Sequence, residues 1–309
     1  MRVLLQFPEG LKQDALGIAR KMERKGDTVF LSASPCYGAC DIALREAELV
    51  GAEKIIHYGH APFPLKGKQG IPVEFVEYRS EVDFQPVLKL ALADGEFRKC
   101  KQVGLVTTVQ HVGQLPAIRK FLEAAGKKAF IGKHGPLSQY DGQILGCDAG
   151  SAVSVDGKVD CLLYFGGGRF HPIAVAIACK KRAICADPFL GKVFWLDEEK
   201  AKYERRKRGM LALGLQAKAF GILVSAKPGQ FNLEAAEALK RRLGELGKEA
   251  EILVADRIEA EALENFHSFD FFISTACPRL AIDDYAQFGK PVLNLSESGE
   301  LLGLLKARQ

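Results

Sequence analysis

The sequence predicts an α/β protein of three similar domains, each a small parallel four-stranded sheet flanked by helices. Three observations support this prediction. Short apolar segments alternate with amphipathic helical segments, which is typical of parallel sheets. The alternation occurs three times, and the 309 residues give each copy an ordinary domain size. We expect domains at 1–97, 98–205 and 206–309, in a pseudo-threefold arrangement.

Each copy opens with an apolar strand, a polar turn and an amphipathic helix. These openings are residues 2–11, 102–115 and 219–233. The helical segments that follow have apolar residues at helical spacing. A glycine stands near the end of each helix, where a residue at positive φ is needed: Gly26, Gly126 and Gly247.

Three further strands follow in each copy. The second strands are expected at 28–33, 128–132 and 250–255. The third strands are expected at 53–59, 160–167 and 270–276. The fourth strands are expected at 71–78, 182–188 and 290–297. Because ligands bind beyond the carboxyl ends of parallel strands, the loops after these strands are the candidate sites.

The composition is that of a globular protein, with 48% hydrophobic and 26% charged residues. The net charge of +5 is too small to indicate a nucleic-acid partner. No apolar run has the length of a membrane span, and the N-terminus does not resemble a signal peptide. We therefore expect a cytoplasmic protein that binds neither nucleic acid nor membrane. The basic run 202–209 is interpreted as a solvated helix end or linker, or as a docking patch for an acidic partner.

The chain has eight cysteines, which do not indicate a disulfide framework in a reducing compartment. Each copy places one cysteine in a loop rich in Gly, Pro or Ser: Cys40, Cys147 and Cys277. If the three loop-bearing edges faced one another, three thiolates would converge and leave one ligand position open, which permits chemistry. Thiolates suit iron–sulfur clusters, zinc or Cu(I), so the residues alone leave the metal open.

The remaining cysteines are interpreted differently. The cysteines within apolar strands or a helix are interpreted as buried structural thiols: Cys161, Cys179 and Cys185. Cys100 lies at a domain boundary and is taken as incidental. Cys36 is interpreted either as a spare ligand or as a loop thiol near the site.

Polar side chains in further loops are expected at the same edges as the cysteines. These pairs are His57 and His60, Gln110 and His111, Arg169 and His171, and Lys227 and Gln230. The chain has no Walker A motif, and its "GGGRF" is weak evidence for a dinucleotide. Backbone amides of these Gly-rich loops suit a carboxylate or a ribose.

Seven short segments occur in one order: "CYGACD", "YGHAPF", "TTVQH", "YDGQILGCD", "FGGGRFHP", "KPGQ" and "TACPRLAIDD". This ordered set resembles the archaeal diphthamide synthase family over nearly the whole chain. The resemblance implies a homodimer in which Cys40, Cys147 and Cys277 of each chain bind a 4Fe–4S cluster. The C-x-x-x-C-x-x-C loop of ordinary radical S-adenosylmethionine enzymes is missing from this chain.

The resemblance also implies the reaction. A reduced cluster, supplied by an electron donor protein, cleaves S-adenosylmethionine between sulfur and the methionine Cγ. The 3-amino-3-carboxypropyl group goes to C2 of a histidine in elongation factor 2, and 5′-methylthioadenosine leaves. We expect four side chains near the cosubstrate and no general base in this chain: Gln230, His60, Gln110 and His171.

Three alternatives remain at this point. The first is an enzyme like quinolinate synthase, which also has three α/β units and a three-cysteine cluster. The second is a noncatalytic cluster-binding subunit of a diphthamide synthase complex. The third is a zinc-binding structural protein.

Overall fold

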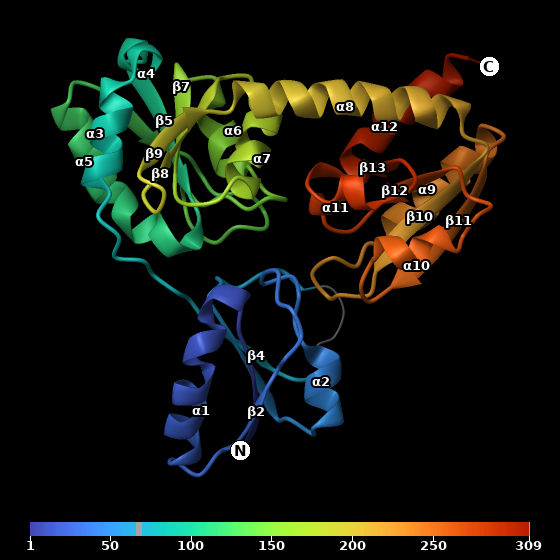
Figure 1. The fold of residues 1–309 in the computed structure, drawn as a ribbon, viewed down its shortest axis with the longest axis horizontal. Coiled ribbons are helices and arrows are strands. Elements are labelled where there is room, and N and C mark those ends of the chain that lie inside the picture. The colour runs from blue at the N-terminus through green and yellow to red at the C-terminus, as the bar shows by residue number, and fades with distance from the viewer. Residues whose placement is uncertain (66–69, 309) are drawn as a thin grey trace. The chain divides into compact units, whose positions relative to one another are not determined.

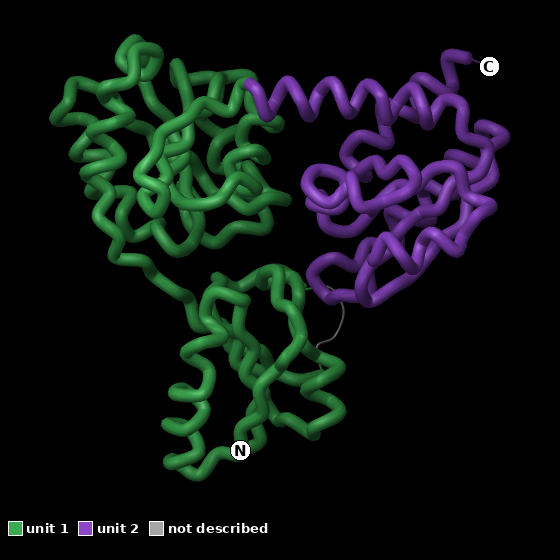
Figure 2. The backbone as a smooth tube through the Cα atoms, in the orientation of Figure 1, with its two compact units in different colours: residues 1–197 green, residues 198–309 purple. Residues whose placement is uncertain are grey.

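Three sheets form the framework of the protein in the computed structural model, which describes residues 1–65 and 70–308 (Figure 1). The strand orders are equivalent: β2-β1-β3-β4, β6-β5-β7-β8-β9 and β11-β10-β12-β13. The chain divides into two compact units, Met1–Asp197 and Glu198–Gln309 (Figure 2). The first unit contains two sheets and the second contains one. The α/β fold class is confirmed, whereas the pseudo-threefold arrangement stays a prediction.

The elements follow the expected order in each copy. The first sheet and its helices are β1 (Arg2–Gln6), η1 (Glu9–Asp14), α1 (Ala15–Glu23), β2 (Thr28–Leu31), α2 (Leu44–Leu49), β3 (Lys54–Tyr58) and β4 (Val73–Val76). The second group is α3 (Gln85–Ala93), α4 (Gly95–Lys99), β5 (Gln102–Thr107), η2 (Val109–Gln114), α5 (Leu115–Ala124), β6 (Lys128–Ile131), α6 (Gly150–Asp156), β7 (Cys161–Phe165), α7 (Phe170–Ala178), β8 (Ala183–Asp187) and β9 (Lys192–Trp195). The third group is α8 (Asp197–Gln216), β10 (Ala219–Ser225), α9 (Leu233–Glu245), β11 (Glu249–Ala255), α10 (Ala260–Glu264), β12 (Phe271–Ser274), α11 (Arg279–Ile282), η3 (Tyr285–Gln287), β13 (Val292–Asn294) and α12 (Leu295–Lys306).

The second sheet has a fifth strand, so the expectation of four strands is wrong there. Strand β9 pairs with β8 antiparallel to it. The reversal is a tight turn in which the carboxylate of Asp187 accepts hydrogen bonds from the backbone N–H groups of Phe189 and Leu190. Gly191 has a φ of 60°, a conformation that favours glycine.

The last strand of the third sheet is shorter than expected. The strand predicted at 290–297 ends at Asn294, where α12 begins. Asn294 and Glu297 form a capping box, in which each side chain accepts a backbone hydrogen bond from the other residue. Since this motif satisfies the open N–H groups of a helix start, residues 295–297 form the first turn of a helix.

Each sheet buries apolar side chains on both faces. In the first sheet, Val3 and Leu5 pack on the side of α1, while Leu4 and Ile55 pack on the side of α2. The second and third sheets likewise have one apolar cluster on each face. Strands buried on both faces are the expected form of a parallel sheet, so the polar groups are displaced to the strand ends and loops.

Three helices end as the sequence predicts. Gly26, Gly126 and Gly247 have φ values of 95°, 80° and 70°. They follow α1, α5 and α9, the first long helix after the opening strand of each copy. The shared helix ending is direct structural support for the threefold repeat.

An acidic residue before the third strand binds the start of the first strand in every copy. Asp160 accepts hydrogen bonds from the N–H groups of Lys101 and Gln102 at 2.7 and 2.8 Å. Asp270 accepts from Lys218 and Ala219 in the same way. In the first copy, Glu53 accepts from Arg2 at 2.9 Å. The first and third strands are thereby aligned at their amino ends.

The two expected domain boundaries both fall inside helices. The boundary at 97/98 lies in α4, and Phe97 packs with Val103 and Leu105 in the core of the second sheet. The boundary at 205/206 lies in α8. The core of the second sheet therefore also includes residues on the amino side of 97/98.

The basic run 202–209 lies within α8, away from its ends. The guanidinium of Arg206 donates to the carbonyl of Ile282 and lies 4.1 Å from the centre of the Tyr285 ring. Lys207 pairs with Glu300 at 2.5 Å. Part of the run therefore holds α8 to its own compact unit.

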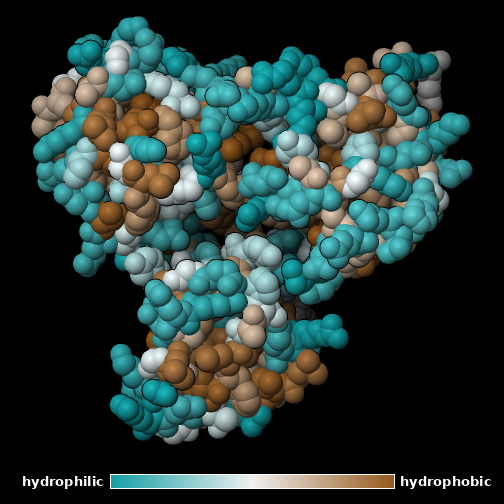
Figure 3. Space-filling view, in the orientation of Figure 1, coloured by the Kyte–Doolittle hydropathy of each residue, from teal (hydrophilic) through white to brown (hydrophobic). Residues whose placement is uncertain are grey.

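Apolar residues also reach the surface of the lobe that carries the first sheet (Figure 3). Leu31, on the edge strand β2, and Leu49, in α2, are 44% and 78% exposed. Within the described part of the chain, no helix is both long and apolar enough to cross a membrane.

The carboxylate of Asp160 gives the first prediction. Hydrogen bonds from Gln102 and Lys101 lower its pKa, so its stabilisation is present above pH 3.8, its ordinary pKa, and is lost as the pH falls through the folded value. Asp160→Asn should lower the free energy of unfolding by about 1 kcal/mol at neutral pH, a small value because the group is exposed.

Urea unfolding of Asp160→Asn and wild type at several pH values measures this effect. The exposed Asp256→Asn is the charge-matched control and should change little. A stability difference that is unchanged at pH 3 would contradict the assignment.

Candidate functional site

The three loop cysteines lie where the sequence predicts. Cys40 lies between β2 and α2, Cys147 between β6 and α6, and Cys277 between β12 and α11. Cys147 is exposed and the other two are half-buried. By contrast, the cysteines expected to be structural are buried: Cys161, Cys179 and Cys185. The three loop cysteines are thus more accessible than these structural thiols, and Cys100, before β5, is also half-buried.

The loop that carries Cys40 is bound by the side chain of Gln6, the last residue of β1. Nε2 of Gln6 donates to the carbonyl of Asp41 at 2.7 Å, and Oε1 accepts from the N–H of Ala43 at 3.1 Å. Gln6 is 1% exposed. Because both ends of the carboxamide are used, the loop on the carboxyl side of Cys40 is held against β1.

The loop that carries Cys147 is held by the next residue, Asp148. Its buried carboxylate accepts hydrogen bonds from the N–H of Leu137, the hydroxyl of Ser138 and the N–H of Gly150. Reciprocal backbone hydrogen bonds between Leu145 and Asp148 form a turn, with Cys147 near its tip. The exposed Cys147 is therefore carried by a turn with a fixed base.

This turn also lies against the start of α7. A Cβ atom on Gly146 would lie 1.9 Å from the ring of Phe170, so glycine is needed for this approach. His171, the next residue, is half-buried and its ring centre lies 5.5 Å from that of Phe170. The structure thus brings together the Cys147 turn and the "FGGGRFHP" segment.

Cys277 lies directly before α11 in the second compact unit. The Nδ2 group of Asn294 donates to the carbonyl of Pro278 at 3.2 Å. The hydroxyl of Thr275 donates to the carbonyl of Leu223 at 2.9 Å. Gln230, in the same unit, is half-buried after β10, and its N–H donates to the carbonyl of Lys227 at 2.9 Å.

Cys36 lies with two histidines at the carboxyl edge of the first sheet. Its sulfur and one nitrogen each of His57 and His60 lie within 4.8 Å of one another. Nε2 of His57 is 2.9 Å from Nδ1 of His60. Burial lowers the pKa of His57 to about 3 and that of His60 to about 4, so both rings are neutral at pH 7.

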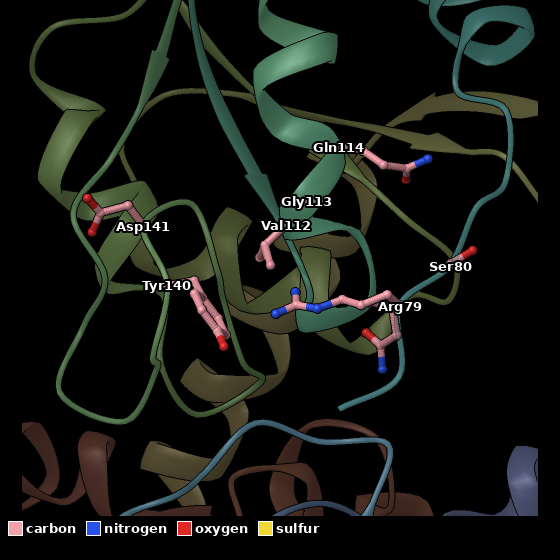
Figure 4. Close-up of a pocket in the computed structure, with 8 residues that line it drawn as sticks. Arg79, Ser80, Val112, Gly113, Gln114, Tyr140 and Asp141 are labelled. Carbon is pink, nitrogen blue, oxygen red and sulfur yellow. The ribbon is translucent and has the colours of Figure 1, made fainter. Parts of the chain in front are cut away.

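Gln110 lies elsewhere, at a pocket of about 510 Å³ beside η2. The pocket is lined by Arg79, Ser80, Gln110, Val112, Gly113, Gln114, Tyr140 and Asp141. The guanidinium of Arg79 faces the ring of Tyr140 at 4.8 Å from its centre (Figure 4). The volume suits a small organic molecule, and His60 is not part of the lining.

Neighbouring His111 does not line this pocket. It is 3% exposed, and its Nδ1 lies 3.1 Å from Oε1 of Gln114. Its ring packs edge-on against Phe165, and burial lowers its pKa. These contacts indicate a packing role for His111.

Sequence reasoning missed the side chains that hold the cysteine loops. The carboxylate of Asp41 accepts a hydrogen bond from the N–H of Tyr37 at 3.4 Å, within the Cys40 loop. Asp41 and Asp148 are both buried and each directly follows a loop cysteine, so the repeated Cys-Asp pair could have indicated them. No sequence pattern around Gln6 indicates its role, because that role depends on which residue lies opposite it in the neighbouring strand.

These features define an α/β protein that presents a cysteine on a loop at the carboxyl end of a strand in each sheet. Its sequence matches the model of the diphthamide synthesis protein family over residues 7–308, and the chain belongs to this family. The membership removes quinolinate synthase from the alternatives.

Curated relatives and solved structures agree with the family. The chain is 37% identical to the 2-(3-amino-3-carboxypropyl)histidine synthase of Pyrococcus horikoshii, over 98% of this chain and 86% of that protein. It is 29% identical to subunit 1 of the human synthase, over 97% of this chain and 68% of that protein. The crystal structure of Pyrococcus horikoshii Dph2 with a 4Fe–4S cluster matches with a TM-score of 0.89 and 35% identity, covering 98% of this chain and 86% of that one.

Asp148 provides a prediction for the Cys147 loop. In Asp148→Asn, the side-chain NH₂ must face one of the donors that the carboxylate now accepts from. We expect a loss of about 1–3 kcal/mol in the free energy of unfolding and faster hydrogen exchange at Leu137 and Gly150.

Hydrogen-exchange mass spectrometry over residues 133–150 measures this change. The control is Asp141→Asn, an exposed carboxylate of the same loop that accepts a hydrogen bond from the N–H of His134. Equal exchange rates in Asp148→Asn and wild type would show that Asp148 does not hold the loop.

Proposed function

We propose that the chain is a 2-(3-amino-3-carboxypropyl)histidine synthase, the enzyme of the first step of diphthamide biosynthesis. The observation that supports this most strongly is that each of the three repeats in this chain of the family carries one loop cysteine after a strand: Cys40 and Cys147 follow the second strand of their copies, and Cys277 follows the third. Each thiol lies on a loop and is at least partly exposed, so an external group can reach it.

We propose that these three thiolates bind a 4Fe–4S cluster and leave one iron open. Soft sulfur donors fit this group, and fewer than four cysteine ligands allow a substrate to bind. When bound, the cluster supplies the electron that cleaves the bond between sulfur and the methionine Cγ of S-adenosylmethionine. The role of the chain is to hold both groups in line, because positioning selects the bond that breaks.

We propose that side chains from other loops after strands contact S-adenosylmethionine. Gln110 belongs to the pocket that also offers the guanidinium of Arg79 and the ring of Tyr140, groups that suit a carboxylate and a base or ribose. His171 and Gln230 are assigned the same role from their loops. For His60, whose Nδ1 faces His57, the atom assigned to the cosubstrate is Nε2.

The acceptor is proposed to be C2 of a histidine of elongation factor 2. The 3-amino-3-carboxypropyl group is transferred there and 5′-methylthioadenosine is released. The reaction also needs an electron donor protein, and a homodimer is the proposed assembly. A translation factor as acceptor places the reaction in the cytoplasm.

The ligand assignment predicts distinct results for buried and loop cysteines. Cys40→Ala, Cys147→Ala or Cys277→Ala should each lose the cluster, whereas Cys179→Ala, a buried thiol outside the site, should keep it. Anaerobic iron and sulfide analysis with visible absorption measures the cluster content. Full cluster content in all three loop variants would overturn the assignment.

The activity is tested with anaerobic protein, S-adenosylmethionine, dithionite and elongation factor 2. Mass spectrometry should find a 3-amino-3-carboxypropyl group on one histidine of the factor, together with 5′-methylthioadenosine. Cluster-loaded protein that releases no 5′-methylthioadenosine would instead be a noncatalytic subunit. Colourless protein that holds only zinc would support a structural role.

A further inference from the structure

We propose that Cys36, His57 and His60 form a second metal site, for one divalent ion such as zinc, which uses none of Cys40, Cys147 and Cys277. Within the described part of the chain, these three residues form a group whose ligand atoms all lie within 4.8 Å of one another. Their side chains offer one sulfur and two nitrogen donors. The proposal does not depend on the proposed enzymatic function.

The fold explains why residues distant in sequence meet here. Cys36 follows β2, His57 is in β3 and His60 follows β3. Both strands pair with β1 in parallel, so their carboxyl ends lie at one edge of the sheet. The place is enclosed, since Cys36 is 5% exposed and His57 is fully buried.

Gln6 determines which nitrogen of His57 faces the group. Its carboxamide orientation is set by the backbone, because the carbonyl of Asp41 needs a donor and the N–H of Ala43 needs an acceptor. Oε1 of Gln6 therefore also accepts from Nδ1 of His57, 3.0 Å away. The lone pair of His57 is then on Nε2, the nitrogen that faces His60.

This arrangement is the one that metal-binding histidines use. A ligating imidazole donates its other N–H group to a neighbouring oxygen, which fixes the ring and its tautomer. Gln6 lies directly opposite His57 in the register of β1 and β3, so the supporting oxygen belongs to the framework of the sheet.

The two rings share one hydrogen bond, which a metal ion would replace. Because Nε2 of His57 accepts, Nδ1 of His60 donates across the 2.9 Å distance. On metal binding, His60 would move its proton to Nε2 and the Cys36 thiol would release its proton to solvent, so that both facing nitrogens and the sulfur become ligands. The nitrogens of a tetrahedral zinc site are about 3.3 Å apart, from Zn–N bonds of about 2.0–2.1 Å, so a small separation of the rings is enough.

The donor set selects the kind of ion. One thiolate and two imidazoles suit zinc and similar transition metals, whereas Mg²⁺ and Ca²⁺ need oxygen ligands. The thiolate charge partly balances the ion in this buried place. Three protein ligands leave a fourth position for water or another small ligand.

Metal binding would also anchor the loop that presents Cys40. The sulfur of Cys36 lies 4.0 Å from the carbonyl oxygen of Gly38, and a Cβ atom at Gly38 would lie 3.7 Å from the sulfur of Cys40. Both thiols thus lie close to one glycine in a short loop.

The test uses the full chain with Cys40, Cys147 and Cys277 all replaced by Ala, so that zinc cannot bind to those thiolates. Zinc is titrated in competition with a chromogenic chelator, under anaerobic and reducing conditions. We expect one zinc per chain. Adding Cys36→Ser, His57→Gln or His60→Gln should weaken binding about tenfold or more, given that loss of even a supporting residue has an effect of this size.

A control variant and a cobalt measurement complete the test. His267→Gln, an exposed histidine outside the group, is the matched control and should bind as the parent does. Substituted Co²⁺ should give a thiolate-to-cobalt absorption band that is lost in Cys36→Ser and kept in His267→Gln. Because His57→Gln removes a buried group and risks misfolding, circular dichroism is recorded, and the half-buried His60→Gln serves as the second variant.

The proposal is overturned if the parent binds no zinc. It is also overturned if folded Cys36→Ser and His60→Gln bind zinc as tightly as the parent. In either case His57 and His60 are a hydrogen-bonded structural pair, in which the ring of His57 packs against Phe75.

Discussion

The register between β1 and β3 is the constraint on which the first sheet's site depends. It places Gln6 opposite His57, and the one carboxamide then binds the cysteine loop and the imidazole together. A buried polar group that loses its partner costs about 1–3 kcal/mol. The loop therefore cannot leave the strand without breaking several such contacts, and the position of Cys40 follows from strand pairing.

The other two sheets hold their cysteine loops with different side chains. In the second sheet the carboxylate of Asp148 binds the base of the turn from within the loop itself. In the third, Asn294 at the end of β13 binds the residue after Cys277. The common principle is that a buried polar side chain binds backbone groups of the cysteine loop. The apolar core orders the sheets, and these polar contacts order the thiols.

Much of the fold was predictable because its signals are local. Apolar runs, helical spacing and a glycine after each helix are properties of neighbouring residues, and they located the strands and Gly26, Gly126 and Gly247 correctly. The predicted strands were wrong where the same local sequence pattern fits more than one structure. The run from Lys290 continues as an apolar pattern past Asn294, where the capping box starts a helix. Strand β9 lies beyond a turn built on Asp187, a contact that spacing does not reveal.

The candidate site also has a part that the sequence predicted and a part that it did not. The loop positions of the three cysteines followed from the repeat, whereas the group of Cys36, His57 and His60 required the register of β1 and β3 and was not predicted. Spacing could not separate Cys36 from Cys40, since both lie in one Gly-containing loop. Their burial separates them, because Cys36 is 5% exposed and Cys40 is half-buried.

Because Cys36 is more deeply buried than Cys40, the two thiols are proposed to bind different metal groups. A thiol enclosed with two imidazoles can bind only an ion that fits among three atoms within 4.8 Å of one another. A 4Fe–4S cluster is larger, and its proposed ligands in this chain come from three separate loops, whose cysteines are exposed (Cys147) or half-buried (Cys40 and Cys277). One short loop can therefore serve two metal sites, because the backbone around Gly38 directs one sulfur inward to the sheet edge and leaves the other nearer the surface.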